Sequence, residues 1–280
     1  MRRLYVTLIM SLMFMGVSIL GIRPSALVAN ANPTQLYFEV HQQGVFIQSF
    51  PQYLPALQAA KTLAEGTVSV NDQVIWQQSQ LQPVQLHVPR IKQMPELPRG
   101  CEVVSLAMIL AYEGVTCNPM QLAKEIKKDR SPYQVRGTKT YFGNPNDGFV
   151  GDMFELKKKG YGVYHGPITE LANQYATGVV DMTGSELNDI LHLVSIGHPV
   201  WVIHNVYFDQ VPASLWRTWH TPSGTVKVTH KEHSVVIHGF DHQFIYITDP
   251  LTSTTKVERQ AFERGWKQMG SQAIAIYRGT

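Results

Sequence analysis

The sequence predicts an α+β fold, with helices early in the main part of the chain and an antiparallel sheet late in it. An apolar helix is expected over residues 102–113 and a second helix over Pro119–Lys128. From Pro199 onward, short runs rich in Val, Ile and aromatic residues alternate with turn residues, which is typical of strands. Helices followed by consecutive strands favour α+β architecture over alternating α/β units.

Residues 1–31 are interpreted as a targeting segment. Met1-Arg2-Arg3 gives a positive start, an apolar run extends to Ile22, and Ala29-Asn30-Ala31 fits a cleavage motif. The apolar run is long for a signal peptide and nearly long enough to span a bilayer, so an uncleaved membrane anchor is the alternative. Either way, the rest of the chain is predicted to be extracellular or at the cell surface. Association with the cell envelope would use this segment.

The charge balance gives no indication of a nucleic-acid partner. The formal net charge is +3, but residues 1–31 contain three arginines and no acidic residue. Without them, 21 basic residues stand against 21 acidic ones. The sequence contains no basic cluster interleaved with aromatic residues, so we expect no binding to nucleic acid.

Residues 33–84 are predicted to form a small module of two strands, a helix and two more strands. About 50 residues bury only a marginal core, so the module is expected to pack against the next domain. No catalytic arrangement is visible in it, which leaves binding or a role in folding. The expected elements are Gln35–Val40, Val45–Phe50, a helix over Pro55–Glu65, Thr67–Val70 and Gln73–Gln77.

Residues 86–280 are long enough for one α+β domain, which is predicted to be a monomer. A turn-rich stretch covers Gly137–Gly151, and further helices are expected at Met153–Lys159 and Ser185–Ile196. The expected strands are Val200–Val206, Val226–Thr229, Ser234–Gly239, Phe244–Thr248 and Ala273–Tyr277.

Cys101 is the candidate nucleophile. A proline-rich turn brings it to the first turn of an apolar helix, where unpaired N–H groups and the helix dipole favour a thiolate. Cys117, the other cysteine, would lie at the far end of that helix, roughly 17 Å away at about 1.5 Å per residue. A disulfide needs Cα atoms within about 7 Å. A buried structural cysteine is the alternative interpretation of Cys101.

The partners for this cysteine are expected in the segment His233–Pro250, which reads as two strands around a turn centred near Asp241. Pairing about that centre places His233 directly opposite Asp249, with Cβ atoms about 5 Å apart. The carboxylate would then orient an imidazole that serves as the base for Cys101. A histidine at a strand start and an Asp-Pro turn are the structural alternatives.

Other kinds of catalytic site find less support. His230, His233, His238 and His242 are close in sequence, but an odd separation places His233 and His238 on opposite faces of a strand. The sequence has no His-Glu-x-x-His or Cys-x-x-Cys motif for zinc and no Gly-x-Ser-x-Gly motif of a serine hydrolase. We therefore expect no metal and no other cofactor.

Together, Gln93, Gly100-Cys101-Glu102, His233-Ser-Val-Val and Tyr246-Ile-Thr-Asp249-Pro250 resemble the papain-like peptidases that process bacteriocin leaders, especially their secreted stand-alone relatives. The resemblance covers roughly residues 86–280. It implies a papain-like cysteine peptidase fold and a peptide or protein substrate. It also implies that Cys101 is the nucleophile, His233 the base, Asp249 its orienting group and Gln93 the oxyanion donor. Gln93 lies somewhat farther before the nucleophile than in the leader-processing members.

Two other functions stay open at this point. A Cys–His–Asp site forms a thioacyl-enzyme, and an amine acceptor in place of water would make it an acyltransferase or transpeptidase. A catalytically inactive cell-surface binding protein is the third possibility. Tyr207, Trp216 and Trp219 are expected in a loop, where they would line a peptide groove or form an ordinary aromatic cluster. The stretch Gly148–Asp152 resembles a loop of the secreted relatives.

Overall fold

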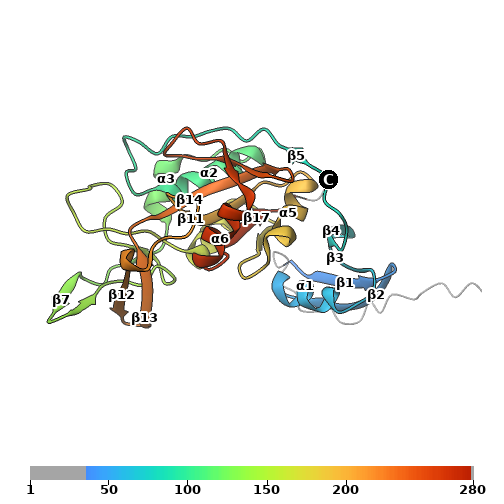
Figure 1. The fold of residues 1–280 in the computed structure, drawn as a ribbon, viewed down its shortest axis with the longest axis horizontal. Coiled ribbons are helices and arrows are strands. Elements are labelled where there is room, and N and C mark those ends of the chain that lie inside the picture. Colours follow the sequence, from blue (N-terminus) through green and yellow to red (C-terminus); the bar gives the residue numbers. More distant parts are fainter. Residues whose placement is uncertain (1–35, 279–280) are drawn as a thin grey trace, which may run out of the picture. The chain divides into compact units, whose positions relative to one another are not determined.

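The computed structural model describes residues 36–278, and the largest sheet in this part of the chain has seven strands (Figure 1). The strand order is β10–β17–β11–β14–β15–β16, and β5 pairs with the far end of β14. Every neighbouring pair in this sheet is antiparallel, as the sequence predicts. The strands are β5 (Val84–Gln85), β10 (Val179–Asp181), β11 (Val200–Asn205), β14 (Glu232–Phe240), β15 (Phe244–Thr248), β16 (Lys256–Glu258) and β17 (Ala273–Ile276).

Helices cover both faces of this sheet because its central strands carry apolar side chains on both sides. Trp201 and Val236 belong to the core under α2 (Cys101–Tyr112) and α4 (His165–Ala172). Their neighbours Val202 and Val235 belong to the opposite core, with α5 (Leu187–Ser195) and α6 (Arg259–Gln268). Successive residues of a strand point to opposite faces, and a strand buried on both faces is therefore continuously apolar.

Helix α2 positions the candidate nucleophile. It begins after Gly100, where an added Cβ would lie 2.6 Å from the Cβ of Leu97. It ends at Tyr112, because Gly114 takes a φ of 74° and the N–H of Val115 bonds back to the carbonyl of Leu110. All residues from Cys101 to Leu110 are buried. The N-terminus of α2 is thus fixed against the central strands.

The N-terminal module has its elements in the predicted order, and its strands form a sheet of order β2–β1–β3–β4. In its helix, the buried residues Tyr53, Ala56, Leu57 and Ala60 recur at helical spacing and face the sheet. The elements are β1 (Phe38–Gln42), β2 (Val45–Phe50), α1 (Tyr53–Lys61), β3 (Gly66–Val70) and β4 (Gln73–Gln77).

This module packs against α5. The indole Nε1 of Trp76 donates to Asp189 Oδ1 at 3.0 Å, and Lys61 Nζ donates to Asp189 Oδ2 at 2.7 Å. Asp189 also closes a capping box with Glu186 at the start of α5, which is the helix that the sequence predicts there. The expected packing of the module on the following domain is seen in these contacts.

The remaining elements are one short helix, one 3-10 helix and short strands joined by turns. Strands β13, β12, β8 and β7 make a four-stranded sheet, and β6 pairs with β9. Trp216 and Trp219 lie on β12 and not in a loop as predicted, and Trp219 is buried against Tyr161 and Phe142. The elements are α3 (Pro119–Glu125), β6 (Lys128–Asp129), β7 (Gln134–Arg136), β8 (Lys139–Tyr141), β9 (Phe149–Val150), the 3-10 helix η1 (Ala213–Leu215), β12 (Trp216–Thr221) and β13 (Gly224–Thr229).

The helix predicted over Met153–Lys159 is wrong, since this stretch forms turns. The guanidinium of Arg99 donates to the carbonyls of Asp152, Glu155, Leu156 and Lys158, so these acceptors bond to a side chain instead of a helix backbone. Helices α4 and α6 are not predicted from the sequence pattern. In α6, Glu258 caps the N-terminus and Phe262 and Trp266 are the large buried side chains, which is too few for a clear periodic pattern.

The predictions for residues 1–31 fall outside the described residues. Between residues 36 and 278, no helix combines the length and the apolar character needed to cross a membrane.

Candidate active site

His233 and Asp249 form a buried hydrogen-bonded pair where β14 begins and β15 ends. The distance from His233 Nε2 to Asp249 Oδ1 is 2.9 Å. Asp249 Oδ1 also accepts from the N–H of Leu251 at 2.7 Å, and Oδ2 accepts from Thr252 Oγ1 at 2.5 Å. The carboxylate is therefore held by its own turn and aimed at the imidazole.

The two residues meet through a register that differs from the predicted one. Val236 faces Thr248, and a bulge between Ile237 and Gly239 shifts the pairing beyond it. Extended from Val236 and Thr248, this register offsets Asp249 by two residues from a position directly opposite His233. An even offset keeps both side chains on one face of the sheet, so the hydrogen bond still forms.

Asp249 is ionised at neutral pH. Burial raises its pKa, but the hydrogen bond and charge of His233, the hydroxyl of Thr252 and the N–H of Leu251 outweigh burial and lower the pKa to about 2. An ionised acceptor at Nε2 keeps that nitrogen protonated, so Nδ1 of His233 is the basic nitrogen. The pair stabilises the fold above the ordinary aspartate pKa of about 3.9, and this contribution is lost as pH falls through about 2.

A second histidine, His204, lies directly opposite His233 on β11. Its Nδ1 accepts from the N–H of Asn205 at 2.8 Å, and its Nε2 donates to the carbonyl of Phe262 at 2.8 Å. Burial is the main cause that lowers the pKa of His204 to about 4. His204 is therefore neutral at physiological pH and adds no positive charge beside His233.

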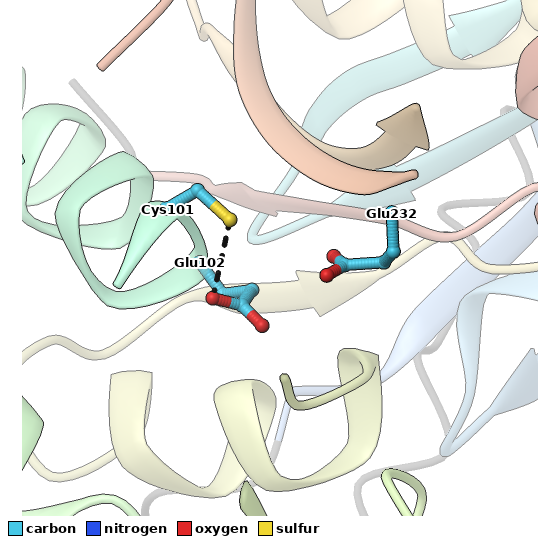
Figure 2. Close-up of side chains that lie close together, drawn as sticks. All are labelled: Cys101, Glu102 and Glu232. Carbon is cyan, nitrogen blue, oxygen red and sulfur yellow. Dashed lines mark hydrogen bonds between the residues drawn. The ribbon is translucent and has the colours of Figure 1, made fainter. Parts of the chain in front are cut away.

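Cys101 is the first residue of α2, and its side chain is buried with 7% of the residue exposed. Its thiol donates to Glu102 Oε2 at 3.3 Å (Figure 2). In the described part of the chain, no hydrogen bond joins this sulfur to the imidazole of His233. The backbone N–H of Ser234, the residue after His233, borders the sulfur, and Ser105 Oγ donates to the Ser234 carbonyl at 3.1 Å. The imidazole of His233 itself points to the opposite face of β14, toward Asp249.

The expectation that the helix N-terminus favours a Cys101 thiolate is wrong for this arrangement. Burial raises the pKa of Cys101 well above its usual value, and the carboxyl groups of Glu102 and Glu232 raise it further. The N–H of Ser234 acts in the opposite direction. A helix dipole contributes about 0.3–1 kcal/mol at an exposed N-terminus, whereas burial among acidic groups costs a thiolate more.

Gln93 lies in the loop between β5 and α2, and this loop contacts residues next to both Asp249 and Cys101. Its N–H donates to the carbonyl of Pro250, next to Asp249, at 3.0 Å. Its side-chain Nε2 donates to the carbonyls of Leu97 and Pro98 at 3.3 and 3.1 Å, in the turn that leads to Cys101. Both amide hydrogens thus hold this turn, and donation to an oxyanion requires one of them to be released. The side-chain Oε1 is buried without a hydrogen-bond partner among the described residues.

The stretch Gly148–Asp152 supports the same turn from the other side. Val150 exchanges backbone hydrogen bonds with Tyr161 and Gly162, and the N–H of Arg99 donates to the carbonyl of Met153 at 3.1 Å. Since Arg99 is two residues before Cys101, this stretch helps to fix the start of α2.

The histidines considered for zinc do not gather around His233. The His238 ring bonds through Nδ1 to the carbonyl of Leu86 at 2.9 Å, and the His230 ring packs against Tyr161 and Trp219.

An open cavity of about 760 Å³ lies between β12, β13 and the C-terminal end of α6. Trp216, Arg217 and Lys227 line one side of it, and Tyr164 lines the other. The hydroxyl of Tyr164 is 2.9 Å from that of Tyr161. Tyr164 is buried near Glu102 and Glu232, so it connects the cavity wall with the surroundings of Cys101.

Sequence reasoning missed the buried carboxyl pair Glu102 and Glu232. Each offers an oxygen within 4.8 Å of the other and of the Cys101 sulfur. Glu102 Oε1 accepts from the N–H of Val163 at 2.7 Å, while Glu232 Oε1 is buried without a partner in the described part of the chain. Burial raises the pKa of Glu102 to about 7 and that of Glu232 well above its usual value. The sequence feature that could have indicated this pair is Glu102, an acidic residue among the apolar residues at the start of α2.

The carboxyl pair predicts that the protein loses stability as pH rises. Because the pKa of Glu102 is raised in the folded state, the protonated carboxyl group stabilises the fold at low pH. This stabilisation is lost as the pH rises from about 4.5 to about 7. The loss is expected to be roughly 3 kcal/mol, from the shift of Glu102 at about 1.4 kcal/mol per pKa unit. Glu232→Gln should make the free energy of unfolding less dependent on pH. The control Glu65→Gln, at an exposed site, should leave the pH dependence unchanged. Urea unfolding at pH 5 and pH 8 measures this, and an unchanged profile in Glu232→Gln would contradict it.

Comparisons with known proteins agree with this fold. The model of the Peptidase_C39-like family matches residues 85–274. The uncharacterised protein YvpB of Bacillus subtilis (strain 168) is 44% identical over 184 residues, which are 65% of this chain and 70% of that protein.

Two crystal structures are also similar. One is of a protein from Bacillus anthracis described as a C39-like peptidase, with 43% identity and a TM-score of 0.65 over 71% of this chain and 99% of that one. The other is a double-glycine-motif protease from an AMS/PCAT transporter with its leader peptide, at 20% identity and a TM-score of 0.37, covering 72% of this chain and 100% of that one. The predicted α+β fold class and the resemblance to these peptidases are confirmed. The chain belongs to the Peptidase_C39-like family.

Proposed function

We propose that this protein is a cysteine peptidase that acts outside the cytoplasm through Cys101, His233 and Asp249. One observation carries the proposal. The ionised, buried carboxylate of Asp249 lies 2.9 Å from Nε2 of His233 and orients the imidazole. The residue after His233 on β14, Ser234, borders the Cys101 sulfur with its backbone N–H. A nucleophile, a base and a group that orients the base are the minimum set for acyl transfer.

The reaction requires the Cys101 sulfur to leave Glu102 and to meet the imidazole of His233, which lies on the other face of β14 in the substrate-free structure. The starts of α2 and β14 must therefore rearrange when the substrate binds. Nδ1 of His233 takes the thiol proton, and the thiolate adds to the carbonyl carbon of a peptide bond. The backbone N–H of Cys101, at the unpaired first turn of α2, donates to the oxyanion, with a released amide hydrogen of Gln93 as the second donor.

The tetrahedral intermediate then collapses in two stages. The C–N bond breaks as His233 returns its proton to the leaving amine, which leaves a thioester on Cys101. His233 next takes a proton from water, whose oxygen adds to the thioester carbon. The C–S bond breaks, His233 returns its proton to the Cys101 sulfur, and the carboxylic acid product leaves. An amine in the place of water would instead form a new amide, which is the acyltransferase reaction.

The cavity beside Tyr164 and Trp216 is the proposed place for substrate side chains. Its volume of about 760 Å³ suits a peptide segment, and Arg217 and Lys227 give it a basic rim. A substrate with acidic side chains near the cleaved bond fits this lining.

The test is cleavage of a peptide library by the purified protein, read by mass spectrometry with and without an added amine. We expect fragments with a new carboxyl terminus in both conditions, and enrichment of acidic residues near the cleaved bond. Products formed only with the amine would identify a transferase. The absence of both products and of any acyl adduct on Cys101 would leave a binding protein.

Location outside the cytoplasm is part of the proposal and is supported by the positive start and apolar run of residues 1–31. Fractionation of cells that express the full chain is expected to place it in the medium or the envelope.

A further inference from the structure

Glu102 and Glu232 come from different parts of the fold and meet in its interior. Glu102 is the second residue of α2, and Glu232 is the first residue of β14. Figure 2 shows both carboxyl groups beside the sulfur of Cys101, with that of Glu102 below the sulfur and that of Glu232 to its right. One oxygen of each lies within 4.8 Å of the other and of the sulfur.

Among residues 36–278, no cationic side chain balances this pair. In the described part of the chain, neither carboxyl group forms an ion pair with lysine, arginine or histidine. The groups that face the pair are the Cys101 thiol from α2 and the phenols of Tyr161 and Tyr164 from the segment before α4. His233 follows Glu232 but turns to the other face of β14, toward Asp249.

Two buried carboxyl groups this close, without a cation, cannot both be ionised at neutral pH, so they hold at least one proton between them. The backbone at Gly162 leaves the space that the pair occupies. A Cβ at this residue would lie 2.3 Å from Glu102 Oε1 and 2.8 Å from Glu232 Oε2. The chain therefore closes around the two carboxyl groups and excludes a side chain there.

We propose that Glu102 and Glu232 share a proton and act as positioning residues, which hold Cys101 as a neutral thiol bonded to Glu102 in the substrate-free enzyme. This inference rests on the proposed role of Cys101 as the nucleophile. The thiol donates to a carboxylate oxygen at 3.3 Å, and the negative charge of the pair disfavours loss of its proton at that position. Catalysis requires the sulfur to leave this charge and to meet the imidazole of His233, which the substrate-free structure holds on the other face of β14. The nucleophile is then ionised only in that rearranged state.

The consequence is a protected cysteine. Oxidants and alkylating agents react with thiolates and hardly with thiols. A protein that acts outside the cytoplasm meets an oxidising environment. The pair keeps Cys101 unreactive there while leaving it available for catalysis.

The test measures the ionisation of Cys101 as a function of pH. Two readouts report it, the ultraviolet absorbance of the thiolate and the rate of alkylation by iodoacetamide. All variants carry Cys117→Ser, so that Cys101 is the one thiol in the chain. In the double variant Glu102→Gln, Glu232→Gln the titration midpoint is expected to fall by at least one pH unit. The rate of alkylation below the midpoint then rises about tenfold.

The matched control removes two carboxylates elsewhere with Glu113→Gln and Glu125→Gln. Glu113 lies at the other end of α2 and Glu125 at the end of α3, so the change is remote, and it removes at least as much negative charge as the double variant because the pair already holds a proton. The control should leave the midpoint of Cys101 unchanged. A variant that only loosens the structure raises the alkylation plateau at high pH without moving the midpoint, and that result overturns the proposal.

A measurement on the unmodified chain tests the proposal even if the double variant does not fold. Infrared spectroscopy at neutral pH is expected to show the C=O stretch of a buried protonated carboxyl group, and its absence would refute the shared proton. Neither readout uses a substrate. A shifted midpoint without peptide hydrolysis would therefore support the pair while rejecting the proposed function.

Discussion

Replacement of Cys101 by alanine is expected to lower peptide hydrolysis by about 10⁴-fold or more, because no other side chain at the start of α2 can form the thioester. The side chain is small and buried, so its loss should leave the fold in place. Initial rates on the best library peptide measure the effect, with circular dichroism to confirm folding.

Cys117 provides the matched control for this change. It is half-buried, its sulfur lies 4.0 Å from the carbonyl of Ala107, and it forms no disulfide with Cys101. Cys117→Ala is expected to keep full activity. Equal losses in the two variants would mean that thiol removal acts through stability, and the nucleophile would have to be sought elsewhere.

Replacement of His233 by alanine is expected to reduce hydrolysis by roughly 10³–10⁴-fold, since the base that accepts the thiol proton is removed. His242→Ala is the control, because His242 is an exposed histidine in the turn of the same hairpin. The rate of iodoacetamide reaction with Cys101 should also fall in His233→Ala. An active His233→Ala enzyme would reject the proposed base.

Asp249→Asn adds a graded test of the same pair. The amide oxygen still accepts from His233 Nε2, but the negative charge that favours the imidazolium is lost. We expect a smaller loss of activity than in His233→Ala. A loss as large as that of His233→Ala would point to collapse of the turn at Leu251 and Thr252.

These variants address different parts of one arrangement. Cys101 touches a carboxyl pair in the substrate-free structure, and His233 is held by a separate carboxylate on the other face of β14. The proposed reaction needs the sulfur to move between these two environments. Activity and thiol ionisation are thus independent readouts.

Several features could be predicted from the sequence because they depend on nearby residues. Gly100 and Gly114 delimit α2 through local backbone geometry. His233 and Asp249 belong to one hairpin, so a short turn brings them together even though a bulge altered the register. An even offset between them was sufficient for contact. By itself, the sequence thus determined the helix that carries Cys101 and the meeting of His233 with Asp249.

Only the tertiary structure decided the direction and the ionisation of the Cys101 thiol. Glu232 reaches Glu102 only when β14 packs against α2, and the burial that raises both carboxyl pKa values exists only in the folded interior. Arg99 likewise replaced an expected helix with turns by donating to carbonyls far along the chain. Local patterns predict elements and short-range pairs, whereas electrostatic free energies depend on which distant groups are buried together.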